Sequence, residues 1–459
     1  MAKTIKRALF VFRRDLRLQD NTALAFALKH AEEVVLSFIF TPEQIEHNSY
    51  RSDHCLQFMI ESLTDLEHEI RKADGRLYLF YGAPQTIIAQ CIKTLKIDAV
   101  MLNCDYTPYS RKRDQLIEQT CIKHTVSFHT FHDLLLHPPE DTLKLDSKPY
   151  TVFTPFFRNA SRLEVAKPLH LPKGKFYARP IDFAKDSTLY TKILPHRSPQ
   201  QKGGRTEALK ILKSLGNYTD YATLRDFPSV EATTHLSPHL KFTTCSAREV
   251  YHALVKHLGS DTPLIRSLYW RDFFTSIAFY FPHVFEGAFH KKFNRISWSR
   301  DKKKFQLWCE GKTGVPIVDA GMREMKETGF MHNRVRMIAG SFLIKDLHID
   351  WRLGESYFAQ TLIDYDPAVN NGNWQWVAST GCDAQPYFRI FNPWTQGKKF
   401  DPDCIYIKKW VPELRSLPPQ AIHAWHLEKH HSLCPDYPKP LVSHEIESKK
   451  AQAMYRDKS

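Results

Sequence analysis

Residues 8–40 read ALFVFRRDLRLQDNTALAFALKHAEEVVLSFIF. Two apolar runs, 8–12 and 34–40, flank residues 22–31, whose apolar side chains recur with the 3.6-residue period of a helix. Continuous apolar runs of this length are typical of strands that are buried on both faces, as in parallel sheets covered by helices. The stretch therefore predicts a strand–helix–strand unit, the repeating element of a doubly wound α/β domain.

The same alternation continues to residue 103. LYLFY at 77–81 and AVMLN at 99–103 predict two more strands, and residues 53–72 and 84–95 have the apolar spacing of helices. In many such sheets the first strand leads into a glycine-rich loop that binds a dinucleotide, but here Arg13, Arg14 and Asp15 follow it. We therefore expect a doubly wound parallel sheet that does not bind a dinucleotide in that manner.

The chain changes character twice after the sheet. From 136 to 205 proline, lysine and serine recur without a regular period, which is typical of a long connector. From 206 onward the pattern becomes helical and aromatic, and all nine tryptophans lie there. We predict an α/β domain at 1–135, an interdomain linker at 136–205 and an all-helical domain at 206–459.

Composition narrows the class of partner. The 64 basic and 50 acidic residues leave a net charge of +14, which favours polyanions, nucleic acid before an anionic membrane surface, although a solvated basic surface would show the same excess. No apolar run is long enough to span a membrane or to form a secretory signal. Nine cysteines without a Cys-x-x-Cys pair predict reduced thiols and no metal site. We expect a cytoplasmic monomer without membrane association.

Thr233, Thr234 and Ser237 cluster just before a predicted helix. Hydroxyl groups and free backbone N–H groups at a helix start suit phosphate oxygens. Ordinary helix capping uses the same residue types, so the cluster alone leaves both interpretations open.

Asn333, Arg336 and Met337 are spaced to share one face of a helix. An amide or guanidinium beside a methionine suits a pocket for a planar polar ligand. A basic surface helix with one core methionine would have the same spacing.

The segment LIDYDPAVNNGNWQW, residues 362–376, concentrates acidic, amide and aromatic side chains. Asp364 and Asp366 fit acid–base catalysis or metal binding, but they fit equally well as ion-pair partners of a buried arginine such as Arg336. Trp374 and Trp376 fit a ligand wall or an ordinary core.

Together, these segments resemble the photolyase and cryptochrome family, and most closely the class I cyclobutane pyrimidine dimer photolyases. The resemblance covers nearly the whole chain. It rests on FRRDLRLQDNTAL, EGKTGVPIVDAGMRE, GFMHNRVRM, IDWRLGE, LIDYDPAVNNGNWQW and YFRIFNP. It implies an N-terminal α/β domain, a long linker and a C-terminal helical domain that binds FAD in a U-shaped conformation.

The resemblance also assigns residues to the flavin. One group matches the segment that binds the diphosphate: Tyr221, Thr233, Thr234, Leu236 and Ser237. Asn333 and Arg336 match residues that line the flavin, and Asp364 and Asp366 match the acidic pair near the ribose and the isoalloxazine edge. Asn370 matches the amide that faces the flavin N5, where a group that can both donate and accept hydrogen bonds suits a changing protonation state.

For the lesion, the resemblance implies an apolar wall made by Trp270 and Trp376, with further contacts from Asn333 and Met337. These four are the implied catalytic residues. Residues that match positions near the DNA backbone or the lesion are Arg225, Trp270, Arg271, Arg334, Arg389 and Gln396. The implied partner is ultraviolet-damaged DNA, whose damaged bases must leave the stack before chemistry.

Trp374, Trp351 and Trp298 match the family's electron-transfer chain, which photoreduces oxidised FAD. One position departs from the pattern, since Ser267 stands where cyclobutane dimer photolyases usually carry a glutamate that contacts the pyrimidine carbonyls. A serine hydroxyl is shorter and donates only one hydrogen bond, so we expect weaker lesion binding or a lower repair yield.

The second chromophore and the lesion type also follow from the resemblance. Tyr109 and Ser110 replace the Asn-Glu pair of folate-binding members, so a deazaflavin, or no antenna, is expected before folate. The (6-4) photolyases use a histidine pair at the lesion, whereas Asn333 follows His332 here and Met337 replaces the second histidine. The implied activity is light-driven repair of cyclobutane pyrimidine dimers by electron transfer from excited reduced FAD. The alternatives are a cryptochrome-type photoreceptor without repair and a flavin-free nucleic-acid-binding protein.

Overall fold

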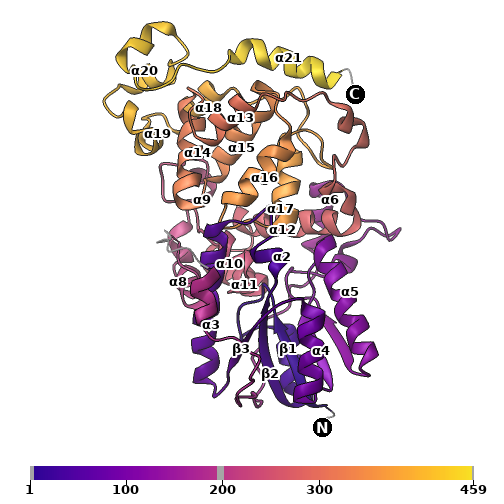
Figure 1. Ribbon diagram of the computed structural model, residues 1–459. Coiled ribbons are helices and arrows are strands. Elements are labelled where there is room, and N and C mark those ends of the chain that lie inside the picture. Colours follow the sequence, from indigo (N-terminus) through magenta and orange to yellow (C-terminus); the bar gives the residue numbers. More distant parts are fainter. Residues whose placement is uncertain (1–4, 194–200, 457–459) are drawn as a thin grey trace. The chain divides into compact units, whose positions relative to one another are not determined.

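The computed structural model describes residues 5–193 and 201–456 (Figure 1). Its contacts divide the chain into two compact units. The first unit comprises Met1–Asn217 with Thr234–Tyr280, and the second comprises Tyr218–Thr233 with Phe281–Ser459. The predicted domains 1–135, 136–205 and 206–459 are sequence segments that do not coincide with these units, and they stay a prediction.

A five-stranded parallel sheet forms the centre of the first unit. Its strands are β1 (Ile5–Phe12), β2 (Ala31–Phe40), β3 (Leu77–Tyr81), β4 (Ala99–Asn103) and β5 (Ser127–Phe131). The strand order is β3-β2-β1-β4-β5, with Ala8 paired to Val34 on β2 and to Ala99 on β4. The four predicted strands and the parallel sheet are confirmed. The edge strand β5 was missed because its sequence SFHTF is only partly apolar and only partly buried.

Helices connect these strands and cover them. They are α1 (Thr22–His30), α2 (Pro42–Ile45), α3 (Asp53–Lys72), α4 (Pro84–Leu95) and α5 (Pro108–Lys123). Side-chain caps define the starts of two of them, because Asn21 accepts from the Leu24 N–H and Ser52 accepts from the Cys55 N–H. Apolar residues of α4 and α5, including Ile88 and Ile117, pack with Leu9 and Val100 of the sheet in one core.

The segment after β5 is short of regular structure, as its sequence predicts. It contains the 3₁₀ turn η1 (Pro139–Thr142) and the helices α6 (Phe153–Ala160) and α7 (Thr188–Ile193). The backbone N–H of Tyr177 donates to the Val34 carbonyl, so part of this segment lies against strand β2. Residues 194–200 of the predicted linker lie outside the described residues.

The first unit is completed by helices from the second half of the chain: α8 (Arg205–Lys213), α10 (Ser237–Lys241), α11 (Ala247–Leu258) and α12 (Pro263–Tyr280), with the 3₁₀ turn η2 (Leu215–Tyr218) at its edge. Helix α11 begins with a full capping box between Ser246 and Glu249. Most residues of helix α12 are buried, and Arg266 and Ser267 are exposed.

The second unit is helical. Its helices are α9 (Tyr221–Leu224), α13 (Lys302–Cys309), α14 (Pro316–Thr328), α15 (Asn333–Ser341), α16 (Trp351–Thr361), α17 (Pro367–Val377), α18 (Pro393–Phe400), α19 (Ile405–Trp410), α20 (Pro419–His423) and α21 (His444–Arg456). Shorter turns are η3 (Pro282–Phe285), η4 (Lys291–Arg295), the π-helical η5 (Phe342–Asp346), η6 (Pro412–Leu414) and η7 (Glu428–Leu433). One large core includes the fully buried Trp308 and Trp425. The predicted helical C-terminal part is confirmed.

Two further observations concern the whole described chain. Its nine cysteines are all free thiols. Among the helices of residues 5–193 and 201–456, none is both long and apolar enough to cross a membrane.

Candidate functional site

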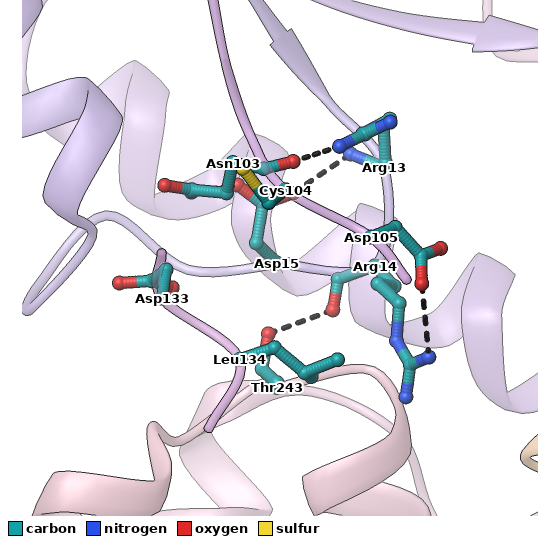
Figure 2. A pocket seen from close by; sticks show the side chains of 9 residues that line it. All are labelled: Arg13, Arg14, Asp15, Asn103, Cys104, Asp105, Asp133, Leu134 and Thr243. Carbon is teal, nitrogen blue, oxygen red and sulfur yellow. Dashed lines mark hydrogen bonds and ion pairs between the residues drawn. The ribbon is translucent and has the colours of Figure 1, made fainter. Parts of the chain in front are cut away.

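The carboxyl ends of β1 and β4 meet where the strand order reverses, which is where open α/β sheets commonly bind ligands. In this protein the crevice is lined by Arg13, Arg14, Asp15, Asn103, Cys104, Asp105, Asp133, Leu134 and Thr243 (Figure 2). The remaining cavity measures about 10 Å³, which holds at most one water molecule. The side chains of the protein itself therefore fill this crevice.

Ion pairs account for that filling. The guanidinium of Arg13 bonds the Asp114 carboxylate at 2.6 Å and the Asn103 carbonyl. Arg14 lies 3.7 Å from Asp105 (Figure 2). It also donates to the Lys241 carbonyl. Burial alone would raise the pKa of Asp105, but the nearby Arg14 and Arg13 lower it to about 2. A chromophore of flavin size would have to separate these pairs to enter.

A second buried network stands beside the crevice. Asp133 bonds Arg17 at 2.5 Å and Arg248 at 2.8 Å, and Arg248 also bonds Asp20 at 3.0 Å. All four side chains are nearly inaccessible to solvent. The pKa of Asp133 would rise through burial, but Arg17 and Arg248 hold it at about 2. These charges join the loop between β1 and α1, the segment after β5 and helix α11.

Trp270 lies on α12 of the first unit, half-buried against an aromatic group. Its indole stacks on Phe153 with ring centroids 3.6 Å apart and planes 5° apart, and Phe274 lies 5.3 Å away. One face of Trp270 is therefore covered by an aromatic ring from α6. The sequence did not reveal Phe153, because it lies in the segment without periodicity and 117 positions from Trp270.

Two neighbours of Trp270 on α12, Arg271 and Ser267, differ in their hydrogen-bond partners and exposure. Arg271 donates to the backbone carbonyls of Leu134 and Leu240, so its guanidinium has structural partners inside the first unit. Ser267 is exposed, and its hydroxyl bonds back onto its own helix at the Pro263 carbonyl, 3.3 Å away.

The phosphate-binding candidates of the first unit lie at the start of α10. Leu236 is buried, Thr234 is half-buried and Ser237 is exposed. Helix α10 has no side-chain cap, so the ordinary capping interpretation of this hydroxyl cluster does not hold for it. Thr233 and Tyr221 belong to the second unit, where both are half-buried.

In the second unit, α15 presents the predicted face. The amide of Asn333 lies 3.8 Å from the Met337 sulfur, as residues four positions apart on a helix should. Arg336 makes a two-pronged ion pair with Asp364 at 3.2 and 3.0 Å, and it also donates to the Met331 carbonyl. The ion-pair interpretation of Asp364 is thus confirmed.

Asp366 has a different local role. Its carboxylate accepts from the Ala368 and Val369 N–H groups and so caps helix α17. This cap fixes the start of the helix that carries Asn370, Trp374 and Trp376.

Asn370 is oriented by a neighbour that the sequence did not reveal. Its Nδ2 donates to the side chain of Glu355 at 3.0 Å and to the Glu355 carbonyl at 3.1 Å. Both amide hydrogens face Glu355, and Oδ1 accepts no hydrogen bond from the part of the chain that the structure describes. Burial raises the pKa of Glu355 to about 7, although the Asn370 amide acts to lower it. The amide oxygen is therefore available to a ligand donor.

Three tryptophans of the predicted electron-transfer chain lie along linked elements. A Cβ at Gly354 would come within 2.2 Å of the Trp374 ring, so this ring lies directly on α16, one turn from Trp351. Trp298 is half-buried, and its neighbour Ser299 pairs with Ile349, two residues before Trp351. Trp374 and Trp351 are both buried, whereas Trp298 is half-buried.

The predicted DNA contacts of the second unit are of two kinds. Arg225 and Arg389 are exposed. Arg334 is ion-paired with Asp226 at 2.9 Å and lies over the Phe400 ring. Gln396 is half-buried, and its Oε1 has no hydrogen-bond partner within the described ranges.

Comparison with known proteins identifies the family of the chain. Residues 8–173 match the DNA photolyase family, and residues 264–457 match the FAD binding domain of DNA photolyase. A relative from Alkalihalophilus pseudofirmus, a deoxyribodipyrimidine photo-lyase, is 35% identical across 97% of both chains.

Two solved structures are also similar. An archaeal photolyase from Sulfolobus tokodaii with two FAD molecules is 40% identical, with a TM-score of 0.91 over 98% of this chain and 100% of that one. A Synechocystis cryptochrome is 26% identical, with a TM-score of 0.90 over 99% and 100% of the two chains. The parallel sheet, the helical unit and these matches show that the chain belongs to the photolyase and cryptochrome family and carries its FAD-binding domain.

Proposed function

We propose that the protein repairs cyclobutane pyrimidine dimers in DNA by light-driven electron transfer. The observation that carries the proposal is helix α17, which holds Asn370, Trp374 and Trp376 within two turns. Flavin contact, electron transfer and lesion contact are therefore all assigned to one rigid element. The relatives named deoxyribodipyrimidine photo-lyase, which match nearly the whole chain, support the same activity.

The residues fit FAD. When bound, reduced FAD supplies the excited-state electron that splits the dimer. Asn370 presents Oδ1 as an acceptor, because Glu355 holds both amide hydrogens. Arg336 on α15 and Asp364, just before α17, are charged groups near Asn370. Because they pair with each other, neither charge is left without a partner. Thr233, Thr234, Leu236, Ser237 and Tyr221 are assigned to the diphosphate through the resemblance of their segment.

For the lesion, Trp270 and Trp376 provide apolar aromatic surface. Phe153 covers one face of Trp270, and in this proposal a flipped pyrimidine stacks on the other. Stacking of a base on an aromatic side chain contributes about 1–3 kcal/mol. Asn333 and Met337 add a polar and an apolar contact from α15.

Exposed arginines supply the affinity for the DNA backbone. Arg225 and Arg389 are the candidates for direct phosphate contact, because they are exposed. Arg271 and Arg334 already hold internal partners, so in this proposal they position the surface around the lesion rather than neutralise phosphates.

The chain Trp374, Trp351, Trp298 conducts an electron inward when FAD is bound in its oxidised form. A second chromophore remains a prediction. The filled crevice at β1 and β4 favours none at that place, because entry requires breaking the Arg13 and Arg14 ion pairs.

The test is light-dependent splitting of thymine dimers in an oligonucleotide, with FAD reduced chemically beforehand and dark controls alongside. We expect thymine absorbance to return only in blue light. Trp376→Ala should lower dimer affinity by about tenfold or more, since one stacking contact is lost. The control Trp374→Phe should repair normally after chemical reduction but lose photoreduction.

The opposite outcome has a clear meaning. A protein that binds and reduces FAD yet splits no dimer would be a cryptochrome-type photoreceptor, an alternative that Ser267 favours and that the similar cryptochrome structure makes concrete.

A further inference from the structure

The segment around Trp298 is strongly basic. Residues 291–304 contain seven cations and one carboxylate, Asp301. The cations are Lys291, Lys292, Arg295, Arg300, Lys302, Lys303 and Lys304. All of them are exposed except Lys304, which is half-buried and lies 4.0 Å from Asp301. We call residues 291–304 the basic segment.

Local structure holds this segment around the tryptophan. The Ser299 N–H donates to the His348 carbonyl at 2.7 Å, which fixes the loop between η4 and α13. One edge of the Trp298 indole meets the buried Tyr455 ring, 6.2 Å between centroids. Because Trp298 is half-buried, part of its indole still reaches solvent.

The position of these charges is unusual for a purely structural role. Six of the seven cations have no carboxylate within ion-pair distance among the described residues, whereas many arginines elsewhere in the chain are paired. No cation is more than seven residues from Trp298, so each lies within about 25 Å of it. Unpaired charge of one sign around an accessible group raises the local concentration of oppositely charged solutes and accelerates their encounter.

We propose that the basic segment recruits a small anionic one-electron reductant to Trp298. The inference rests on the proposed function, because Trp298 becomes an oxidant only after it has passed an electron inward. The reductant gives one electron to the Trp298 cation radical, which returns to the neutral indole. The donor is oxidised by that electron, and no bond is made or broken in the protein.

Nucleic acid is the competing occupant, since exposed lysines also attract phosphates. The half-buried indole favours a small donor, because a ligand must approach the ring within the loop to exchange an electron efficiently. DNA binding by the same segment would not need Trp298 at its centre.

The experiment is flash photolysis of the protein with oxidised FAD bound. The measured quantity is the decay of tryptophan-radical absorption as a function of donor concentration, with hexacyanoferrate(II) as the anionic donor and hydroquinone as the neutral one. Salt is varied from about 0.01 M, where charges act over about 30 Å, to about 1 M, where they act over about 3 Å. Affinity for dimer-containing DNA is measured on the same proteins.

The variant is K302E/K303E, in the first turn of α13, where glutamate suits the helix N-terminus and should preserve folding. The control is K429E/K439E, which changes net charge equally at exposed lysines outside the basic segment. We expect K302E/K303E to slow quenching by hexacyanoferrate(II) at low salt by about tenfold, with little effect on hydroquinone. The control should resemble the unmodified protein, and the difference should vanish at high salt.

Three results would overturn the inference. If K429E/K439E slowed quenching by hexacyanoferrate(II) equally, the effect would come from the net charge of the protein and not from the basic segment. Unchanged quenching combined with weaker DNA binding would assign the basic segment to DNA. A tryptophan-radical signal that is the same in Trp298→Phe as in the unmodified protein would show that Trp298 takes no part in electron transfer. Dimer splitting with chemically reduced FAD would still test the proposed repair activity separately.

Discussion

The two candidate ligand sites, one in each unit, differ in how their polar groups are paired. In the first, the charges at the end of the sheet pair with one another until about 10 Å³ of space remains. In the second, the side chain of Asn370 on α17 uses only its amide nitrogen. Its amide oxygen accepts no hydrogen bond from the described residues. The sheet has the crevice that ligands favour, but the helical unit keeps the polar atoms that a ligand needs.

Aspartate–arginine pairs therefore have different roles in the two units. Asp133 and Asp364 each pair with arginine. Asp133, after β5, joins the loop between β1 and α1 to helix α11, whereas the Asp364 pair lies beside the proposed flavin residues. Removal of a charge in the first unit should therefore cost stability. Alteration of a polar group in the second should change titration or ligand chemistry.

The largest effect is expected for Asp133→Asn. The substitution leaves Arg17 and Arg248 without their shared carboxylate in a buried place, which should lower the free energy of unfolding by about 3–5 kcal/mol. Urea denaturation followed by far-ultraviolet circular dichroism measures this. The pKa of Asp133 is held at about 2, so its contribution should be present above about pH 4 and lost as the pH falls toward 2.

The matched control for that variant is Asp146→Asn, an exposed carboxylate 3.4 Å from Lys148, which should cost less than about 1 kcal/mol. Flavin affinity of folded Asp133→Asn should equal that of the unmodified protein. A variant of normal stability that loses flavin would break the distinction between the two units.

A smaller effect, with the opposite pH dependence, is expected for Glu355→Gln. Burial raises the pKa of Glu355 to about 7, so the folded protein holds a proton that the unfolded chain releases near pH 4.5. Its contribution to stability is therefore full below about pH 4.5 and is lost as the pH rises through 7. The difference in unfolding free energy between the unmodified protein and Glu355→Gln should fall by about 3 kcal/mol over that range.

Urea midpoints of both proteins between pH 4 and 8 measure this difference. Glu327→Gln, an exposed carboxyl on α14, is the control and should give a curve parallel to that of the unmodified protein. Parallel curves for Glu355→Gln as well would mean that burial does not keep Glu355 protonated, and the contrast between the units would lose its chemical basis.

Sequence patterns predicted the sheet well and the contacts poorly. Continuous apolar runs located β1 to β4 because both faces of those strands are buried, whereas β5 escaped because an edge strand is only partly buried. Helical spacing correctly placed Asn333, Arg336 and Met337 on one face. Contacts such as Phe153 on Trp270 join residues far apart in sequence, and periodicity carries no information about such pairs.

Residue type alone also left the acidic pair ambiguous. Asp364 and Asp366 were equally compatible with catalysis, metal binding or ion pairing, and only their neighbours distinguish them. Arg336 pairs with the first, and the start of α17 is capped by the second. Gly354 is one sequence feature that indicates a contact. A glycine leaves room for the close approach of a ring, here that of Trp374.

The smallest effect is expected at Ser267, which lies in the first unit but serves the lesion in our proposal. Its hydroxyl donates its hydrogen to the Pro263 carbonyl and so has no hydrogen to donate to the dimer. Ser267→Ala should therefore repair dimers as the unmodified protein does. Ser267→Glu restores a longer polar group at an exposed helix position and should add one hydrogen bond to the dimer. A gain of about 1 kcal/mol corresponds to about fivefold tighter binding. Dimer affinity and repair yield per absorbed photon measure it, and equal values for all three proteins would show that this position does not contact the lesion. The contrast between the units would then sharpen, because the contribution of α12 to the lesion would come from Trp270 and Arg271 without Ser267.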